Sequence, residues 1–324
     1  MDVEPAGFQL DGPDPAQWDG FAATTGLVEE LRAGLTARTG RRPVVGWYHR
    51  MDPQITAVYG RPDHAIRTFP ESVTAQRARG DYFGLHVHPV RRGADGRAWV
   101  HDFGDPATVT GAVEHCADAF TAALGESPRR HRGGLGGITE AMVTALDHLG
   151  ITVDLSMERS RGDLTEVRSG VDVSPVLGRT ADCTGAPRAA YRPRIGEFAP
   201  PGGVPTDEGH RRVTLVPLTT TTRGRLPRRP GRLVRRLLGH RPGPRVMFPN
   251  LAWPSPRWFW DLALREAERM ERPYLSFAIR TDAPDSVPSR QAAAVLRALP
   301  DHPIADRIDL VDPLTVLADL VPPD

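Results

Sequence analysis

Two histidines separated by a single residue have the side chains best placed to do chemistry in this protein. His86 and His88 lie in the segment Gly84-Leu85-His86-Val87-His88-Pro89. Alternate side chains of an extended strand point the same way, so this segment predicts two imidazoles close together on one face. Neutral imidazole binds zinc and its first-row neighbours, and a catalytic zinc site uses about three protein ligands. The spacing therefore predicts a clamp for a divalent metal.

Asp52 is the expected third ligand. It follows the apolar segment 42–48, which predicts a second strand, and parallel strands bring their carboxyl ends to the same edge of a sheet. A second interpretation of the histidine pair stays open, in which one ring packs in the core and the other is solvated.

The segments that must position these residues alternate between strand and helix. Leu27, Leu31 and Leu35 recur at helical spacing, and Gly40 is placed to end that helix. The same patterns predict helices over 105–125, 139–150, 255–270, 287–298 and from 313, and strands over 43–48, 82–88, 151–155, 213–217, 274–279 and 307–311. Strands and helices in alternation are typical of an α/β fold.

Two segments lack this regularity. Residues 1–22 are rich in Pro, Asp and Gly and are expected to form an irregular leader, and residues 159–245 an irregular Arg/Gly/Pro-rich insertion within a single domain spanning 1–324. Within it, residues 223–245 hold nine arginines and no acid. That run could grip a phosphate-bearing substrate or an acidic partner, or lie solvated on the surface.

Composition excludes several classes of function. The net charge of +1 indicates no general attraction to nucleic acid or to a membrane, and no apolar run has the length of a signal peptide or a membrane span. Cys116 and Cys183 have no partner at metal or redox spacing, so a cytoplasmic location is expected. All 41 basic residues are arginine, and the absence of lysine excludes phosphate loops of the Walker type, pyridoxal chemistry and Schiff-base aldolases. The oligomeric state is not predicted.

Three motifs in order resemble the polysaccharide deacetylase (NodB-homology, carbohydrate esterase family 4-like) superfamily. They are residues 84–89, then His131-Arg132-Gly133-Gly134 before a helix, then residues 149–156. The strand end at Asp52 and the late Arg280-Thr281-Asp282 fit the same order. The resemblance implies a distorted, incomplete (β/α) barrel of about seven parallel strands, a divalent metal, usually Zn²⁺, held by Asp and two His, and hydrolysis of N-acetyl or O-acetyl groups.

The chain departs from the family pattern at three places. Family members carry two adjacent aspartates after the first strand, one as base and one as ligand, whereas this chain has Met51-Asp52. The usual His-x-x-x-His is replaced by His86 and His88, and the late catalytic histidine by Arg280-Thr281-Asp282. The family's metal ligands therefore have better counterparts in this chain, at Asp52, His86 and His88, than its catalytic acid and base do.

The remaining roles are assigned by that resemblance and by residue type. Arg132 matches the arginine that holds the base aspartate; with Met51 in the usual base position, Asp154 or Asp282 could replace the base, and His101 could serve as acid. Trp47, Trp99 and Tyr191 could stack on a sugar ring and Arg280 could contact substrate, although packing explains aromatic residues equally well.

The expected function is a metal-dependent hydrolase that removes an acyl group, N-acetyl above all, from a carbohydrate or small N-acylated metabolite. It would act on carbon–nitrogen amide bonds that are not peptide bonds. Two alternatives stay open: a metal-dependent lyase or isomerase on a sugar-like substrate, favoured by the missing base and acid, and a non-catalytic carbohydrate-binding relative. The expected partner is a small-molecule or glycan substrate.

Overall fold

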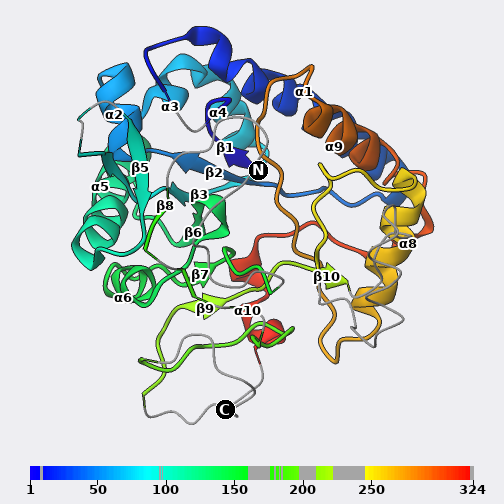
Figure 1. Cartoon of the computed structure of the whole chain (residues 1–324). Coiled ribbons are helices and arrows are strands. Elements are labelled where there is room, and N and C mark those ends of the chain that lie inside the picture. The colour runs from blue at the N-terminus through cyan, green and yellow to red at the C-terminus, as the bar shows by residue number, and fades with distance from the viewer. Residues whose placement is uncertain are drawn as a thin grey trace, which may run out of the picture.

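A parallel β-sheet of six strands forms the centre of the computed structural model (Figure 1). In spatial order the strands are β1 (Asp2–Val3), β2 (Gly46–Arg50), β3 (Tyr82–Val87), β6 (Arg130–Gly133), β7 (Val153–Asp154) and β9 (Thr214–Leu215), and each pairs with its neighbour in parallel. The structure describes residues 1–7, 10–94, 96, 98–159, 176–178, 180–181, 183, 185–196, 209–221 and 245–321. This mostly parallel sheet with surrounding helices confirms the α/β fold class.

Helices surround the sheet, with α5 and α6 at the left of Figure 1 and α8 and α9 at the right. The described helices are α1 (Asp19–Thr39), α2 (Pro53–Tyr59), α3 (His64–Thr68), α4 (Pro70–Ala78), α5 (Pro106–Leu124), α6 (Glu140–His148), α8 (Pro256–Ala267), α9 (Val287–Arg297) and α10 (Leu317–Leu320), with short 3₁₀ turns at Pro15–Trp18, Gly134–Gly136, Pro303–Arg307 and Pro313–Thr315. The helices begin where the capping pattern predicts: Asp105 caps α5 and Ser255 caps α8 through their side chains. Gly40, in the left-handed conformation, ends α1.

One extended segment, residues 274–281, joins the two outer strands of the sheet. Its Ile279 carbonyl accepts from the N–H of Asp2 in β1 at 2.8 Å, and the N–H of Thr281 donates to the Asp2 carbonyl at 3.1 Å. At its other end the Ser276 carbonyl accepts from the N–H of Thr219, just beyond β9, at 2.9 Å. Residues 274–279, predicted as a strand, form no regular strand, but this extended segment bonds to both edges of the sheet.

Two apolar clusters pack on the helical side of the sheet. The larger one places α1, α2, α5 and α6 against the strands, with Phe21, Trp47, Leu85 and Phe120 fully buried. The second joins the other face of α1, through Leu31 and Leu35, to α8 and α9. Helix α1 thus packs on both clusters, which explains why its apolar residues do not form a single stripe.

Two smaller sheets complete the described structure. Strands β4 (Val90–Arg92) and β5 (Trp99–Asp102) are antiparallel, and β8 (Val176–Leu177) pairs in parallel with β5. Strands β10 (Thr220–Thr221) and β11 (Arg245–Val246) form an antiparallel pair. The hairpin of β4 and β5 follows directly after His88 and carries His101 beside it.

Some expected elements differ from the structure. The segment 1–22 contains β1, a 3₁₀ turn and the start of α1, so it is not an irregular leader throughout: residues 2–3 pair with β2 in the main sheet. Residues 307–311 form no strand, although Leu310 accepts one bond from Val44. Most of the predicted insertion, including nearly all of 223–245, lies outside the described residues. In the part of the chain that is described, no helix is both long and apolar enough to cross a bilayer.

Candidate metal centre

The register of the sheet places four polar residues in one row across neighbouring strands. Arg50 of β2 is paired with His86 of β3, and His86 with Arg132 of β6. Val3 is paired with His49, so the next residue, Glu4, lies beside Arg50. Residues in register share a face of a parallel sheet, so Glu4, Arg50, His86 and Arg132 point to the same side. Hydrophobic neighbours such as Leu85 and Val87 point to the other side, toward the helices.

The carboxylate of Glu4 and the two predicted imidazoles converge. The Nε2 atoms of His86 and His88 lie 3.0 Å apart. Oε1 of Glu4 lies 3.6 Å from His86 Nε2, and Oε2 lies 3.1 Å from His88 Nε2. In the described chain these three residues form the group of His, Cys, Asp and Glu ligand atoms that lie within 4.8 Å of one another, and all three are buried. The predicted convergence of His86 and His88 is confirmed.

The other nitrogen of each imidazole is held by the surrounding structure. Nδ1 of His86 lies 3.0 Å from the Arg132 carbonyl, which can only accept, so this nitrogen carries the proton. Nδ1 of His88 lies 2.8 Å from Nε2 of His101, which is fully buried on β5. Such contacts hold the orientation of both rings, and in His86 they leave Nε2 as the lone-pair donor, which is how metal-binding histidines are usually supported.

Gly134 makes room for the His88 ring. A Cβ at this position would lie 2.3–2.4 Å from three atoms of that imidazole, closer than real contacts allow. The next residue, Leu135, has a backbone φ of 56°, a value that residues other than glycine rarely adopt. The glycine pair noted in the sequence, Gly133-Gly134, therefore includes one position that is needed for the ligand geometry.

Two arginines neutralise Glu4. Arg280 Nε lies 2.8 Å from Oε1, and Arg50 Nη1 lies 3.7 Å from Oε2. Burial alone would raise the pKa of Glu4, but Arg280 and the two imidazoles outweigh it and hold that pKa well below its ordinary value. Burial, together with the charge of Arg50, holds the pKa of His88 well below its ordinary value. The carboxylate is thus ionised and the His88 imidazole neutral, the protonation states in which both bind metal.

The donor set fits a divalent cation of the zinc type. One carboxylate and two neutral imidazoles are ligands that zinc takes in catalytic sites. Tetrahedral zinc with bonds of 2.0–2.1 Å separates its ligand atoms by roughly 3.3 Å, and the observed 3.0 and 3.1 Å are close to that.

Asp52, the expected third ligand, is placed elsewhere. Its Oδ2 lies 2.6 Å from Arg50 Nε, and its Oδ1 accepts from the backbone N–H groups of Gln54 and Ile55. These bonds make Asp52 the N-cap of α2, so both oxygens are engaged. The structure therefore brings Glu4, in place of Asp52, to the two histidines. The physical reason is that the short β1 inserts between β2 and the segment 274–281, which brings Glu4, directly after β1, into the row.

Arg132 holds an aspartate, as its motif implies, and that aspartate is Asp2. Arg132 Nε lies 2.8 Å from Asp2 Oδ2, and Arg132 also donates to the Leu155 carbonyl at 2.8 Å. Burial opposes ionisation of Asp2, but Arg132 and His86 lower its pKa. Asp2 Oδ1 is buried without a hydrogen-bond partner among the described residues. Two acids, Asp2 on β1 and Glu4 directly after it, thus lie two residues apart at this end of the sheet.

Asp282 lies at the partly exposed side of the centre. Its Oδ1 lies 3.2 Å from Arg280 Nε, the same nitrogen that contacts Glu4. Burial raises the pKa of Asp282; Arg280 opposes this, and the negative charges of Glu4 and Asp2 add to the rise. Of the residues predicted to do acid/base chemistry, Asp282 and Arg132 are the ones that join this cluster through ion pairs.

The other predicted residues take structural positions. Asp154 lies 2.6 Å from His131 Nδ1 and accepts from Ser156, and its register with His131 puts it on the opposite face from His86. His101 contacts His88 and is fully buried, and burial lowers its pKa to about 3, which favours a neutral imidazole.

The three aromatic residues expected to stack on a sugar are buried. Trp47 is fully enclosed and donates to Asp81 at 3.0 Å. Tyr191 packs in an apolar cluster with its hydroxyl on Met157, and the Trp99 ring is covered by the guanidinium of Arg92, whose Cζ lies 4.2 Å from the ring centroid. Stacking by these rings is therefore not supported, because neighbouring side chains occupy their faces.

Sequence reasoning missed Glu4 and Asp2. The pattern Asp2-Val3-Glu4-Pro5 has the same alternation as His86-Val87-His88-Pro89, with two polar residues of one chemistry flanking a valine before a proline. That parallel is the signal that could have identified them. A strand of two residues is too short for a periodicity argument, and its partner became visible only with the register.

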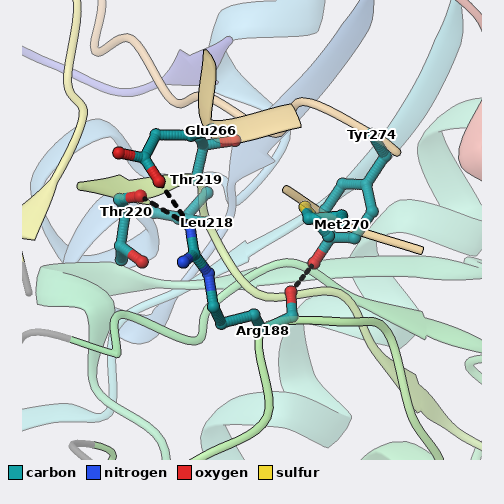
Figure 2. A pocket seen from close by; sticks show the side chains of 7 residues that line it. All are labelled: Arg188, Leu218, Thr219, Thr220, Glu266, Met270 and Tyr274. Atoms are coloured by element: carbon teal, nitrogen blue, oxygen red, sulfur yellow. Dashed lines mark hydrogen bonds and ion pairs between the residues drawn. The ribbon is translucent and has the colours of Figure 1, made fainter. Parts of the chain in front are cut away.

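A small hollow lies apart from this centre, at β10 and α8 (Figure 2). Arg188, which lines this hollow, bonds to two other lining residues. Its guanidinium donates to Glu266 at 2.6 Å, and its backbone carbonyl accepts from the Tyr274 hydroxyl at 2.8 Å. Thr221 and Arg269 also donate to Glu266. These bonds satisfy a buried acid between a strand and a helix, which is a structural role.

The fold and the site together define an α/β protein with a buried carboxylate–imidazole centre suited to a divalent cation. No protein-family model and no curated protein matches the chain. Among solved structures it is similar to a protein described as a polysaccharide deacetylase from Mycobacterium smegmatis, with 9% identity over 94% of this chain and 79% of that one, at a TM-score of 0.47. It is also similar to a family 4 carbohydrate esterase from Streptomyces lividans, with 15% identity over 45% and 57% of the two chains and a TM-score of 0.27.

A third similar structure is a de-N-acetylase from Aggregatibacter actinomycetemcomitans, with 8% identity over 56% of this chain and 92% of that one, at a TM-score of 0.24.

Proposed function

We propose that this protein is a metal-dependent hydrolase that removes an acyl group, N-acetyl in the first instance, from a carbohydrate or a small N-acylated metabolite. The observation that carries the proposal is the convergence of Glu4, His86 and His88 beside the Arg132–Asp2 pair. A ligand set, a supported imidazole pair and an ionised acid on one face of the sheet are the parts that hydrolysis of an amide requires.

Glu4, His86 and His88 would hold the cation, which supplies a Lewis acid for the acyl carbonyl and lowers the pKa of water bound to it. The protein supplies the rest. Asp2, ionised and oriented by Arg132, accepts the proton of the attacking water at its unpaired Oδ1. Its position two residues before Glu4 on the same strand face directs it to the same side as the ligands.

Asp282 donates the proton that the departing amine needs. Its environment raises its pKa, whereas the environment of Asp2 lowers the pKa of that carboxyl. Two carboxyl groups whose pKa values are pushed apart are the usual arrangement for one base and one acid in the same site. The alternative of a lyase or isomerase was favoured by a missing base and a missing acid. With Asp2 as the base and Asp282 as the acid, that reason no longer applies.

Acetate release with and without metal tests the proposal. Protein stripped with a chelator and reloaded with Zn²⁺ is incubated with N-acetylated sugars and small N-acetylated amines. We expect acetate only from the metal-loaded protein, and loss of zinc binding in His86→Ala. Zinc binding with no acetate from any compound would favour the lyase or isomerase, and a protein that binds no divalent metal would leave the carbohydrate-binding alternative.

A further inference from the structure

Most of the centre is closed to solvent, and Arg280 stands where it opens. The side chains of Glu4, His86, His88 and Arg50 are 0–3% exposed, whereas those of Arg280 and Asp282 are 22% and 21% exposed. Among the described residues of this cluster, a ligand that comes from solvent meets the Arg280 guanidinium and the Asp282 carboxyl first.

Arg280 and a bound cation compete for the same carboxylate. Arg280 Nε lies 2.8 Å from Oε1 of Glu4, the oxygen that also lies 3.6 Å from His86 Nε2. A cation held by Glu4 and the two imidazoles would neutralise part of the Glu4 charge and so weaken the ion pair between Glu4 and Arg280. Arg50 is not an equivalent neighbour, because it is fully buried and held by Asp52 and Gln54. A cation at this position would therefore weaken the attraction of Glu4 for Arg280, on the exposed side, more than for Arg50.

The net charge of the groups around Glu4 would also become positive when a cation binds. Among the described residues, the ion pairs that link Glu4 to Arg50 and Arg280, and these to their own acids, include three carboxylates, those of Glu4, Asp52 and Asp282, and the two guanidinium groups. Their net charge is −1, and a divalent cation changes it to +1. Protonation of Asp282, which its role as the acid requires, would make it more positive still.

From this geometry we propose that the substrate is anionic, with a carboxylate or phosphate that Arg280 binds close to the acyl group that is removed. The inference rests on the proposed function and names its substrate class. A guanidinium presents two parallel N–H donors to a carboxylate or phosphate, a match that a neutral sugar hydroxyl does not offer. Arg280 is then the residue that determines specificity, and the metal ligands are common to any acyl substrate.

Matched compounds test this directly. N-acetylglucosamine is neutral; its 6-phosphate and N-acetylmuramic acid keep the ring and the amide but add a phosphate or a carboxylate. We expect the zinc-loaded protein to prefer one or both of the anionic compounds at least tenfold in kcat/KM, and the two arms distinguish phosphate from carboxylate. The preference should fall to about unity in Arg280→Gln, recover in part in Arg280→Lys, and persist in the control Arg297→Gln, an exposed arginine paired with Glu30.

Binding provides a readout that does not depend on turnover. Calorimetry with the deacetylated products should show glucosamine 6-phosphate or muramic acid binding at least tenfold more tightly than glucosamine, with loss of the difference in Arg280→Gln. A preference for anions that is unchanged in Arg280→Gln, or no preference in wild type, overturns the inference even if acetate is released. Zinc binding without acetate release overturns the proposed function, and the calorimetric comparison still decides the role of Arg280.

Discussion

Nε2 of His101 lies 2.8 Å from Nδ1 of His88, which makes one imidazole the support of another. The contact comes from two different strands, because His101 is on β5 and His88 follows β3. It brings the hairpin of β4 and β5 against the proposed metal ligand His88, whose ring angle the contact holds.

We expect His101→Ala to lower the affinity for Zn²⁺ by roughly 10- to 100-fold, the usual cost of losing such a support. His101→Gln, whose amide oxygen can accept from His88, should recover part of it. Calorimetric titration of the metal-free proteins measures this. Equal affinity in wild type and His101→Ala would show that His88 is held by other contacts.

Gly134→Ala should also weaken zinc binding, because the new methyl group would occupy the space of the His88 ring. The matched control is Gly111→Ala in the interior of α5, where a Cβ meets nothing within 4 Å. That variant should bind zinc normally and be more stable by about 0.5–1 kcal/mol, since alanine suits a helix better than glycine. The two variants are compared by zinc titration and thermal unfolding; normal zinc affinity in Gly134→Ala would contradict the packing described for His88.

Asp2→Asn separates catalysis from metal binding. The amide keeps the shape of the side chain but cannot accept a proton as a carboxylate does, so acetate release should fall at least ~100-fold. Zinc affinity should stay within a few-fold of wild type, since Asp2 is not among the three ligand residues. Asp285→Asn, an exposed aspartate beyond the site, is the control. An active Asp2→Asn protein would remove Asp2 from the mechanism.

His49 predicts how the protein responds to acid. It is fully buried between Phe21 and Phe83, with neither ring nitrogen hydrogen-bonded within the described chain, and burial lowers its pKa to about 3. Between about pH 6.5 and 3 the unfolded chain binds a proton at this residue that the folded chain does not. The contribution of His49 to stability is thus present above pH 6.5 and is lost as the pH falls, at up to about 1.4 kcal/mol per pH unit.

His49→Leu should reduce that acid sensitivity. Chemical unfolding at pH 7.5 and 4.5 should show a smaller loss of stability in the variant than in wild type, and His148→Gln, at an exposed position, should behave as wild type. Identical losses in His49→Leu and wild type would mean that other groups control unfolding by acid.

Features that depend on neighbouring residues were predicted from the sequence, and features that depend on distant segments were not. Local signals worked: the cap at Asp105, the cap at Ser255 and the glycine end at Gly40 fix helix termini within a few residues, and alternation in one strand brought His86 and His88 together. These features depend on neighbours in the sequence.

The third ligand depends on pairing between distant segments, and there the sequence misled. Asp52 follows the right kind of strand, but a residue just after a strand and before a proline is also a good N-cap, and that role engaged it. Glu4 reaches the histidines because β1 pairs with β2 and because residues 279–281 bond to β1, the latter contacts spanning more than 270 residues. Thr281 even bonds both the N–H and the carbonyl of Glu4.

The position of bound zinc is the most direct test of the central claim, that Glu4, His86 and His88 form one metal centre. Crystals of the protein grown with Zn²⁺ are measured on both sides of the zinc absorption edge. The account predicts one strong anomalous peak within bonding distance of a Glu4 oxygen and both Nε2 atoms. A peak beside Asp52 that excludes Glu4, or no peak near the two histidines at saturating zinc, would contradict it.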